Sequence, residues 1–214
     1  MSNPTFYFHG LQVSELNLFI SDLIMATTAL VCWLRLKNNL PALTAQSYYH
    51  HFFLFTMLAT SIAGFGHLLN LYTGIYLKLI GWFFSTLANY YFILASLQFD
   101  TYKNNYNGYK KLAVLKLLVA IIFLFLTKVF VVISIDTTIS IGLVVLPIHF
   151  LEWKKTKMKG YLWICIGILF TMLTGLVSVF NLSISETWFN AKDLNHIIIS
   201  GGLYLIYKGL TKLQ

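Results

Sequence analysis

The chain has 214 residues, of which 58% are hydrophobic and only 10% are charged. Soluble domains carry about 25% charged residues, so this composition excludes a compact domain with a water-facing surface. The net charge is +8, but the basic residues fall mostly in short loops between apolar segments, which is typical of cytoplasmic loops and not of a nucleic-acid-binding surface. We therefore predict an all-α polytopic membrane protein that lies in a lipid bilayer and does not bind nucleic acid.

Seven apolar segments are each long enough to cross the hydrocarbon core, for which a helix needs about 20 residues. In chain order, the predicted spans are 14–36, 48–72, 75–100, 110–134, 137–153, 160–182 and 192–212. Pro147 is expected to kink the fifth of these. The connections are short, so we expect one seven-transmembrane helix bundle over residues 1–214.

The charges of the loops predict how the bundle is oriented. Lysine and arginine gather after the first span, between the third and fourth, between the fifth and sixth, and at the end of the seventh. The opposite loops carry Asp136, Glu186 and Asp193, with Lys192 as the main exception. Because Lys-rich loops stay in the cytoplasm, the N-terminus is predicted outside and the C-terminus inside. The composition and the short loops favour a bacterial cytoplasmic (inner) membrane.

Ionisable residues inside the spans are the main functional clue, because each costs about 2.5–3.5 kcal/mol to insert. Asp22 lies about 12 Å from the outer end of the first span at 1.5 Å per residue, and His67 and His196 lie at similar depths in the second and seventh spans. Asp193 precedes His196 by three residues, on the same helix face. We predict that these groups converge on a zinc ion held by His67, His196 and either Asp22 or Asp193. The remaining carboxylate would act as general base.

Four more polar residues are predicted around this site. Glu15 begins the first span, Asn70 follows His67, and Ser200 and Tyr204 continue the helix face that carries His196. Two acids also have a simpler interpretation: Glu15 and Asp193 stand where a first-turn acid complements the helix dipole. Asn190, three residues before Asp193, resembles an N-cap residue.

The pattern resembles the CREST superfamily, which includes alkaline ceramidases, progestin and adipoQ receptors and hemolysin III-like proteins. The residues that carry the resemblance are Gly64-Phe65-Gly66-His67 in the second span and Asp193-Leu194-Asn195-His196 in the seventh, with Glu15 and Asp22 placed like the family's first-span acids. The resemblance implies an intramembrane zinc hydrolase that acts on lipid amides. It extends loosely to an uncharacterised group of bacterial seven-span proteins with a Gly-x-x-His second span and an Asp-x-x-His seventh span.

The sequence departs from the CREST pattern at three places. Ala63 stands where the family has a serine four residues before the second-span histidine. Only His196 is present where the last span of the family has two histidines. The family's aspartate after the second-span histidine is missing near Lys78.

Three functional hypotheses follow. The first is a zinc-dependent intramembrane hydrolase that acts on a lipid amide or ester through a site open to the outer leaflet. The alternative is a non-catalytic small-molecule binding or transport protein, or a subunit of a membrane complex, in which Asp22 pairs with Lys128. The third is a b-type haem protein, with His67 and His196 ligating one haem and His51 and His149 another.

Overall fold

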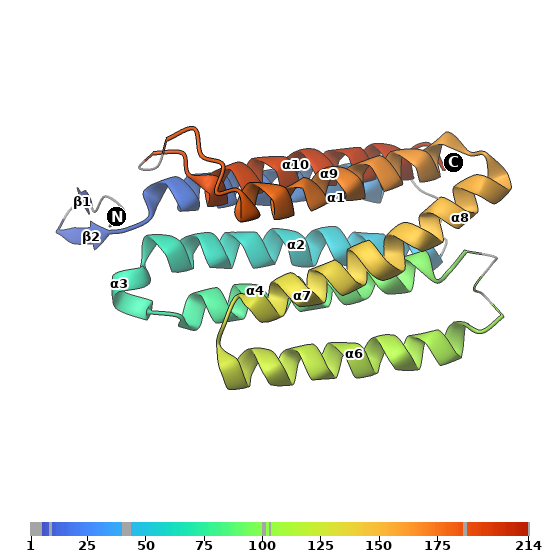
Figure 1. Ribbon diagram of the computed structural model, residues 1–214, viewed down its shortest axis with the longest axis horizontal. Helices are drawn as coiled ribbons and strands as arrows, with labels where there is room; N and C mark the ends of the chain where they lie inside the picture. The colour runs from blue at the N-terminus through green and yellow to red at the C-terminus, as the bar shows by residue number, and fades with distance from the viewer. Residues whose placement is uncertain are drawn as a thin grey trace.

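The computed structural model describes residues 6–8, 10–39, 44–99, 102, 104–185 and 188–213. A small antiparallel hairpin of β1 (Phe6–Phe8) and β2 (Leu11–Val13) comes first. The helices are α1 (Leu16–Asn39), α2 (Thr44–Leu68), α3 (Asn70–Thr73), α4 (Tyr76–Ser96), α6 (Tyr106–Thr127), α7 (Val131–Thr137), the π-helix η1 (Thr138–Val145), α8 (Leu146–Thr156), α9 (Lys159–Val179) and α10 (Ala191–Leu210). The fold is therefore all-α apart from the hairpin (Figure 1).

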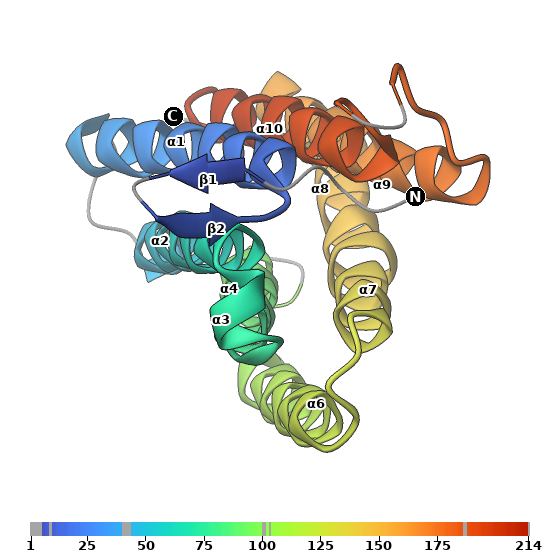
Figure 2. The same cartoon turned by 90° about the vertical axis from the view of Figure 1, so that its left-hand side faces the viewer.

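The long helices lie roughly along one axis and pack mainly against their neighbours in the chain. Figure 2 shows α9, α10 and α1 side by side along one edge, with α2, α4 and α6 following one another away from α1. The closing contact is between α1 and α10, which brings the first and last helices together. Since α1 contacts both α2 and α10, a residue on α1 can meet residues from both of them.

Five helical segments are long and apolar enough to cross a membrane: Leu16–Leu36, Ala45–Leu68, Tyr76–Ser96, Val131–Thr156 and Lys159–Val179. The chain thus has the apolar helices of a multi-pass membrane protein. Two further predicted spans form helices of similar length, α6 and α10. They are more polar because α6 carries Lys110, Lys111 and Lys116, and because the start of α10 carries the predicted site residues.

Helix bounds differ from the predicted spans where the chain turns. The helix expected over 110–134 ends at Thr127, because Lys128 adopts a left-handed conformation with φ 54°. The following helical segment starts at Val131, earlier than the predicted 137. Within this segment the π-helix ends directly before Leu146 and Pro147. Proline has no N–H and its ring clashes with the preceding turn, so the local change of helical register accommodates it.

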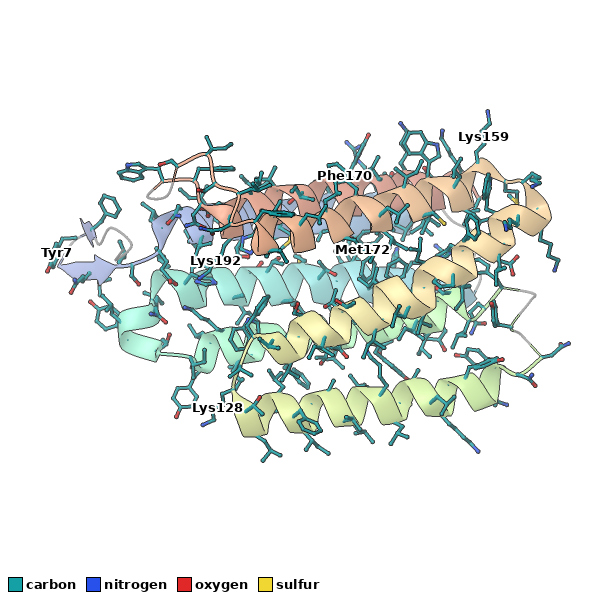
Figure 3. The ribbon with its side chains drawn as sticks, in the orientation of Figure 1. Tyr7, Lys128, Lys159, Phe170, Met172 and Lys192 are labelled. Atoms are coloured by element: carbon teal, nitrogen blue, oxygen red, sulfur yellow. The ribbon has the colours of Figure 1, made fainter. Side chains whose placement is uncertain are left out.

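The two ends of the bundle are marked by different segments. Tyr7 of the hairpin marks one end, and Lys159, the first residue of α9 after the Lys-rich end of α8, lies at the opposite end (Figure 3). Lys128 and Lys192 are on the hairpin side of the molecule. Glu186, one of the acids used to predict orientation, lies outside the described residues. The end that carries the hairpin is called the hairpin end below.

Candidate functional site

Asp22 is the centre of a buried polar cluster near the hairpin end. It lies on α1, is 2% exposed, and contacts histidines from both neighbouring helices. Its Oδ2 is 4.0 Å from Nε2 of His67 on α2, and its Oδ1 is 3.4 Å from Nδ1 of His196 on α10. The structure therefore brings together the three residues that the sequence predicts at similar depths along their spans.

Glu15 holds the His67 ring from the other side. Its Oε2 is 2.5 Å from Nδ1 of His67 and 3.0 Å from Nζ of Lys78 at the start of α4. Glu15 lies one residue before α1 with φ 51°, so it is not the first-turn acid of the simpler interpretation. This left-handed conformation costs about 1–2 kcal/mol for a residue with a Cβ.

The electrostatics of Glu15 explain how that conformation is maintained. Burial alone would raise the pKa of its carboxyl, but hydrogen bonds from His67 and Lys78 and the charges of both groups lower that pKa from 4.5 to about 2. A charged carboxylate with a protonated neighbour is a strong acceptor. Glu15 is therefore fixed as an anion beside the His67 ring.

Asp193 holds the second imidazole indirectly. Its Oδ1 accepts a hydrogen bond from Ser21 Oγ at 3.1 Å, and Ser21 Oγ lies 2.9 Å from Nδ1 of His196. Its Oδ2 accepts from Asn17 Nδ2 at 2.7 Å and from the backbone N of Asn190 at 3.0 Å. With these partners Asp193 is 1% exposed, and it orients other groups through hydrogen bonds.

The predicted helix cap is confirmed at the same place. The Asn190 side chain accepts hydrogen bonds from the backbone N–H groups of Lys192 and Asp193, and the Asp193 side chain accepts from the Asn190 N–H, which makes a capping box. Such a cap contributes about 1 kcal/mol to helix stability. The capping acid and the partner of Ser21 are thus the same carboxylate.

The hydrogen bonds assign a tautomer to each imidazole. His67 Nδ1 faces the Glu15 carboxylate, which can only accept, so Nδ1 carries the proton. Ser21 has one hydroxyl proton, which we assign to the Asp193 carboxylate because it is a stronger acceptor than a neutral ring nitrogen. His196 then donates its Nδ1–H to Ser21. In the neutral form of each ring, Nε2 is then the nitrogen with the lone pair.

Two polar atoms face each other across the centre of the cluster. His67 Nε2 lies 4.0 Å from Asp22 Oδ2, which is buried and has no hydrogen-bond partner in the described structure. An unpaired buried acceptor is costly. A proton or a cation between the two atoms would satisfy both. A tetrahedral zinc site with bonds of 2.0–2.1 Å holds its ligand atoms about 3.3 Å apart, so these two atoms would have to move closer to share a zinc ion.

Glycines of α2 make this close approach possible. A Cβ on Gly64 would stand 3.0 Å from Asp22 Cβ, and one on Gly66 would stand 2.8 Å from the backbone N of Lys78. Contacts this short would force α1 and α4 away from α2. The Gly64-Phe65-Gly66-His67 segment thus places one glycine against α1 at Asp22 and another against the start of α4 at Lys78.

Other predicted residues lie outside the cluster. Ser200 Oγ donates to the backbone O of His196 and so supports only the backbone of α10. Tyr204 is 50% exposed and packs near Tyr207. Asn70 is the first residue of α3, after the end of α2, and no hydrogen bond to the cluster is seen in the described part of the chain.

The alternative ion pair between Asp22 and Lys128 is not formed. The Lys128 ammonium lies 5.6 Å from the Tyr76 ring centroid, while Asp22 faces the two histidines. The predicted Asp22–Lys128 pair is therefore wrong, because α6 ends at the far side of α4.

The two histidines proposed for an inner haem have separate surroundings. His149 is fully buried, with Nε2 near Tyr49 and Ser96. His51 bonds the Ser47 carbonyl and stacks on Tyr91.

The sequence analysis missed three members of the cluster. Asn17 and Ser21 are spaced i, i+4 on the face of α1 that meets α10, a polar pair that could have been noticed. Lys78 follows the second predicted span, on the side of the bundle whose loops carry most of the acids. Because lysines are expected mainly in the cytoplasmic loops, a lysine on this side suggests a specific partner.

Metal-binding geometry is only partly present. In the ranges given above, no group of three or more His, Cys, Asp or Glu side chains is close enough to hold a metal ion. His67 and Asp22 alone face a common point, because His196 turns Nδ1 toward Ser21 and Asp22. A third ligand would require movement of the His196 ring.

A second buried ion pair lies away from this cluster. Lys116 of α6 is 2.5 Å from Asp136 Oδ1 on α7, and Asn89 of α4 donates to Asp136 Oδ2 at 2.7 Å. Lys116 also contacts Ser140 of the π-helix. These bonds tie the peripheral helix α6 to α4 and α7.

The comparisons with known proteins give one match. The model of a family of unknown function, DUF6962, matches residues 18–214, which include Asp22, His67 and His196 but not Glu15 and Asn17. No curated protein sequence and no solved structure matches the chain.

Proposed function

The chain belongs to DUF6962, a family of unknown function, and we propose from its site that it is a zinc-dependent intramembrane hydrolase acting on a lipid amide or ester. The observation that carries the proposal is the buried Asp22 Oδ2, which has no hydrogen-bond partner in the described structure and lies 4.0 Å from Nε2 of His67. The two imidazoles around it are each held at Nδ1 by a carboxylate, directly by Glu15 or through Ser21 by Asp193.

We place this site in the outer leaflet of a seven-span bundle. The proposal counts α6 and α10 as spans beside the five apolar segments, because both have the length that a crossing requires. The Lys-rich connection between α8 and α9 lies opposite the hairpin end, and such connections face the cytoplasm. The N-terminus is then outside, the C-terminus is cytoplasmic, and a bacterial inner membrane fits the short loops.

The residues present offer a zinc ion two kinds of support, which are donor atoms and outer hydrogen bonds. His67 and Asp22 offer the nitrogen and carboxylate oxygen that zinc accepts, and His196 is the third candidate ligand. Glu15 and Ser21 supply the outer hydrogen bonds that fix the ring and tautomer of metal-binding histidines. When bound, zinc would activate a water molecule and polarise a substrate carbonyl.

The protein's own groups have distinct roles in this proposal. His67 and Asp22 would hold the metal, and His196 would join them after its ring turns. Asp193, whose oxygens already accept several hydrogen bonds, positions His196 through Ser21. Glu15 positions His67 and stays ionised because of its partners. Burial of Asp22 by α2 and α10 keeps bulk water away from the reacting centre.

Metal analysis of purified protein tests the proposal. The full chain, prepared in detergent and incubated with zinc, should contain zinc and protein in roughly equal amounts, and it should hydrolyse members of a panel of fluorogenic lipid esters and amides. His67→Ala and Asp22→Asn should each lose the metal and the activity. His51→Ala is the matched control, because it removes a histidine from the opposite end of the same helix.

A chain without bound zinc, or one whose zinc content is unchanged in His67→Ala, would overturn the proposal. His67 would then be an imidazolium held between Glu15 and Asp22, and the cluster would be a structural ion network.

A further inference from the structure

A groove opens on the side of the bundle beside this cluster. It has a volume of about 170 Å³ and lies between α1, α10 and the connection that precedes α10. The α1 residues that line it recur every three or four positions and so lie on one face of that helix. Residues of the hairpin, of the connection before α10 and of α10 itself form the rest of the lining. The lining includes Phe6, Asn17, Ile20, Ser21, Ile24 and Trp188, with Ile197 on α10.

The walls of the groove face lipid. Ile20 is 50% exposed and Ile24 is 44% exposed, on a helix apolar enough to span the membrane. Phe6 and Trp188 close the hairpin end, with ring centroids 5.9 Å apart. This apolar groove opens on the side of the bundle, so it is accessible from the hydrocarbon phase of a bilayer. Phe6 and Trp188 cover it toward the hairpin end.

The floor of the groove is polar and lacks one hydrogen-bond donor. Asn17 and Ser21 line it, and both bond Asp193. Asn17 Oδ1 is buried and has no hydrogen-bond partner in the described structure, although its amide nitrogen is used. Buried acceptors normally find a donor, so an occupant with an O–H or N–H group would complete the floor.

We infer that this groove binds a single-chain lipid, with its acyl or alkyl chain along Ile20 and Ile24 and a hydrogen-bond donor at Asn17 Oδ1. The floor leads through Ser21 to His196, so the groove is the lateral route by which the substrate of the proposed hydrolase enters. The entry role rests on the proposed function, whereas binding in the groove does not require a metal.

A matched pair of photoreactive probes tests the inference. A long-chain fatty alcohol with a diazirine in its chain and the methyl ether of the same molecule differ only in the hydrogen-bond donor. Each is added to the full chain in detergent, and the labelled peptides are identified by mass spectrometry. Label should concentrate around Ile20, Ile24 and Trp188. The alcohol should label about threefold to tenfold more than the ether, the range that one net hydrogen bond supplies.

Four variants distinguish the contribution of the apolar walls from that of the polar floor. Ile20→Trp fills the groove and should reduce labelling about tenfold, with Ile197→Phe as a second blocking variant if the first does not fold. Ile122→Trp, at an exposed site on α6, is the control and should label as the wild type does. Asn17→Ala should remove the preference for alcohol over ether while some labelling by both probes persists.

The outcomes distinguish this inference from the proposed function. Lipid binding in the groove would be refuted by label spread evenly over the exposed apolar faces, or by equal labelling by alcohol and ether in the wild type. Labelling should persist in His67→Ala. A chain that binds zinc but is not labelled in the groove refutes this inference alone, and a chain that is labelled in the groove but binds no zinc refutes the proposed hydrolase alone.

Discussion

Acidification should weaken the hairpin end of the bundle through Glu15. Its carboxyl has a pKa of about 2 in the folded chain, compared with an ordinary value of 4.5. A group whose pKa is lower in the folded state stabilises that state fully above the ordinary value. This contribution is lost as the pH falls from about 4.5 through about 2.

The magnitude follows from the difference between the two values. At 1.36 kcal/mol per unit the upper limit is about 3 kcal/mol. The Glu15 side chain is 17% exposed, and solvent screening reduces the contribution to about 1–2 kcal/mol. For a chain of this length, that is a shift of about 2–8 °C in the unfolding midpoint.

Thermal unfolding of the wild type and Glu15→Gln, followed by tryptophan fluorescence in detergent at constant ionic strength, measures the effect. The wild type should be the more stable at about pH 6, and the two proteins should converge as the pH approaches about 2. Comparing the two proteins cancels the titration of the other groups. A stability difference that stays constant over this range would falsify the assignment of Glu15 as the partner of His67 and Lys78.

Three further predictions concern packing and charge. Lys116→Met leaves the Asp136 charge buried without its partner and should destabilise the chain by about 3 kcal/mol; adding Asp136→Asn should restore most of this in the same unfolding assay, and simple additivity of the two changes would contradict the pairing. Asn190→Ala removes the cap of α10, which should lower stability by about 1 kcal/mol and speed amide hydrogen exchange in its first turn; unchanged exchange would argue against the capping box. Gly64→Ala places a Cβ 3.0 Å from the aspartate of α1 and should cost about 1–3 kcal/mol and weaken zinc binding, whereas Gly175→Ala, which meets nothing within 4 Å, should do neither.

The membrane character and the axial placement of the cluster could be predicted because both depend on local properties. Apolar length identifies a spanning helix, and a rise of 1.5 Å per residue gives depth. Asp22, His67 and His196 were expected at one depth, and the structure places them in contact. The helix ends near Lys128 were less predictable, because the hydrophobic pattern continues through the turn.

The partners within the cluster depend on packing. The expected Asp22–Lys128 pair required α6 to lie beside α1, but α1 packs against α2 and α10. Asp193 was predicted as a metal ligand or general base, and its oxygens are instead occupied by Asn17, Ser21 and the Asn190 backbone.

The sequence by itself determined that this chain forms apolar helices with a few ionisable residues near one end, since composition and helical rise require no knowledge of neighbours. Only the tertiary structure decided which helices adjoin, how each is rotated, and that Glu15 and Ser21 hold the two imidazoles. The reason is that rotation and adjacency depend on how side chains of different helices fit together. At Gly64 that fit depends on the absence of a single Cβ.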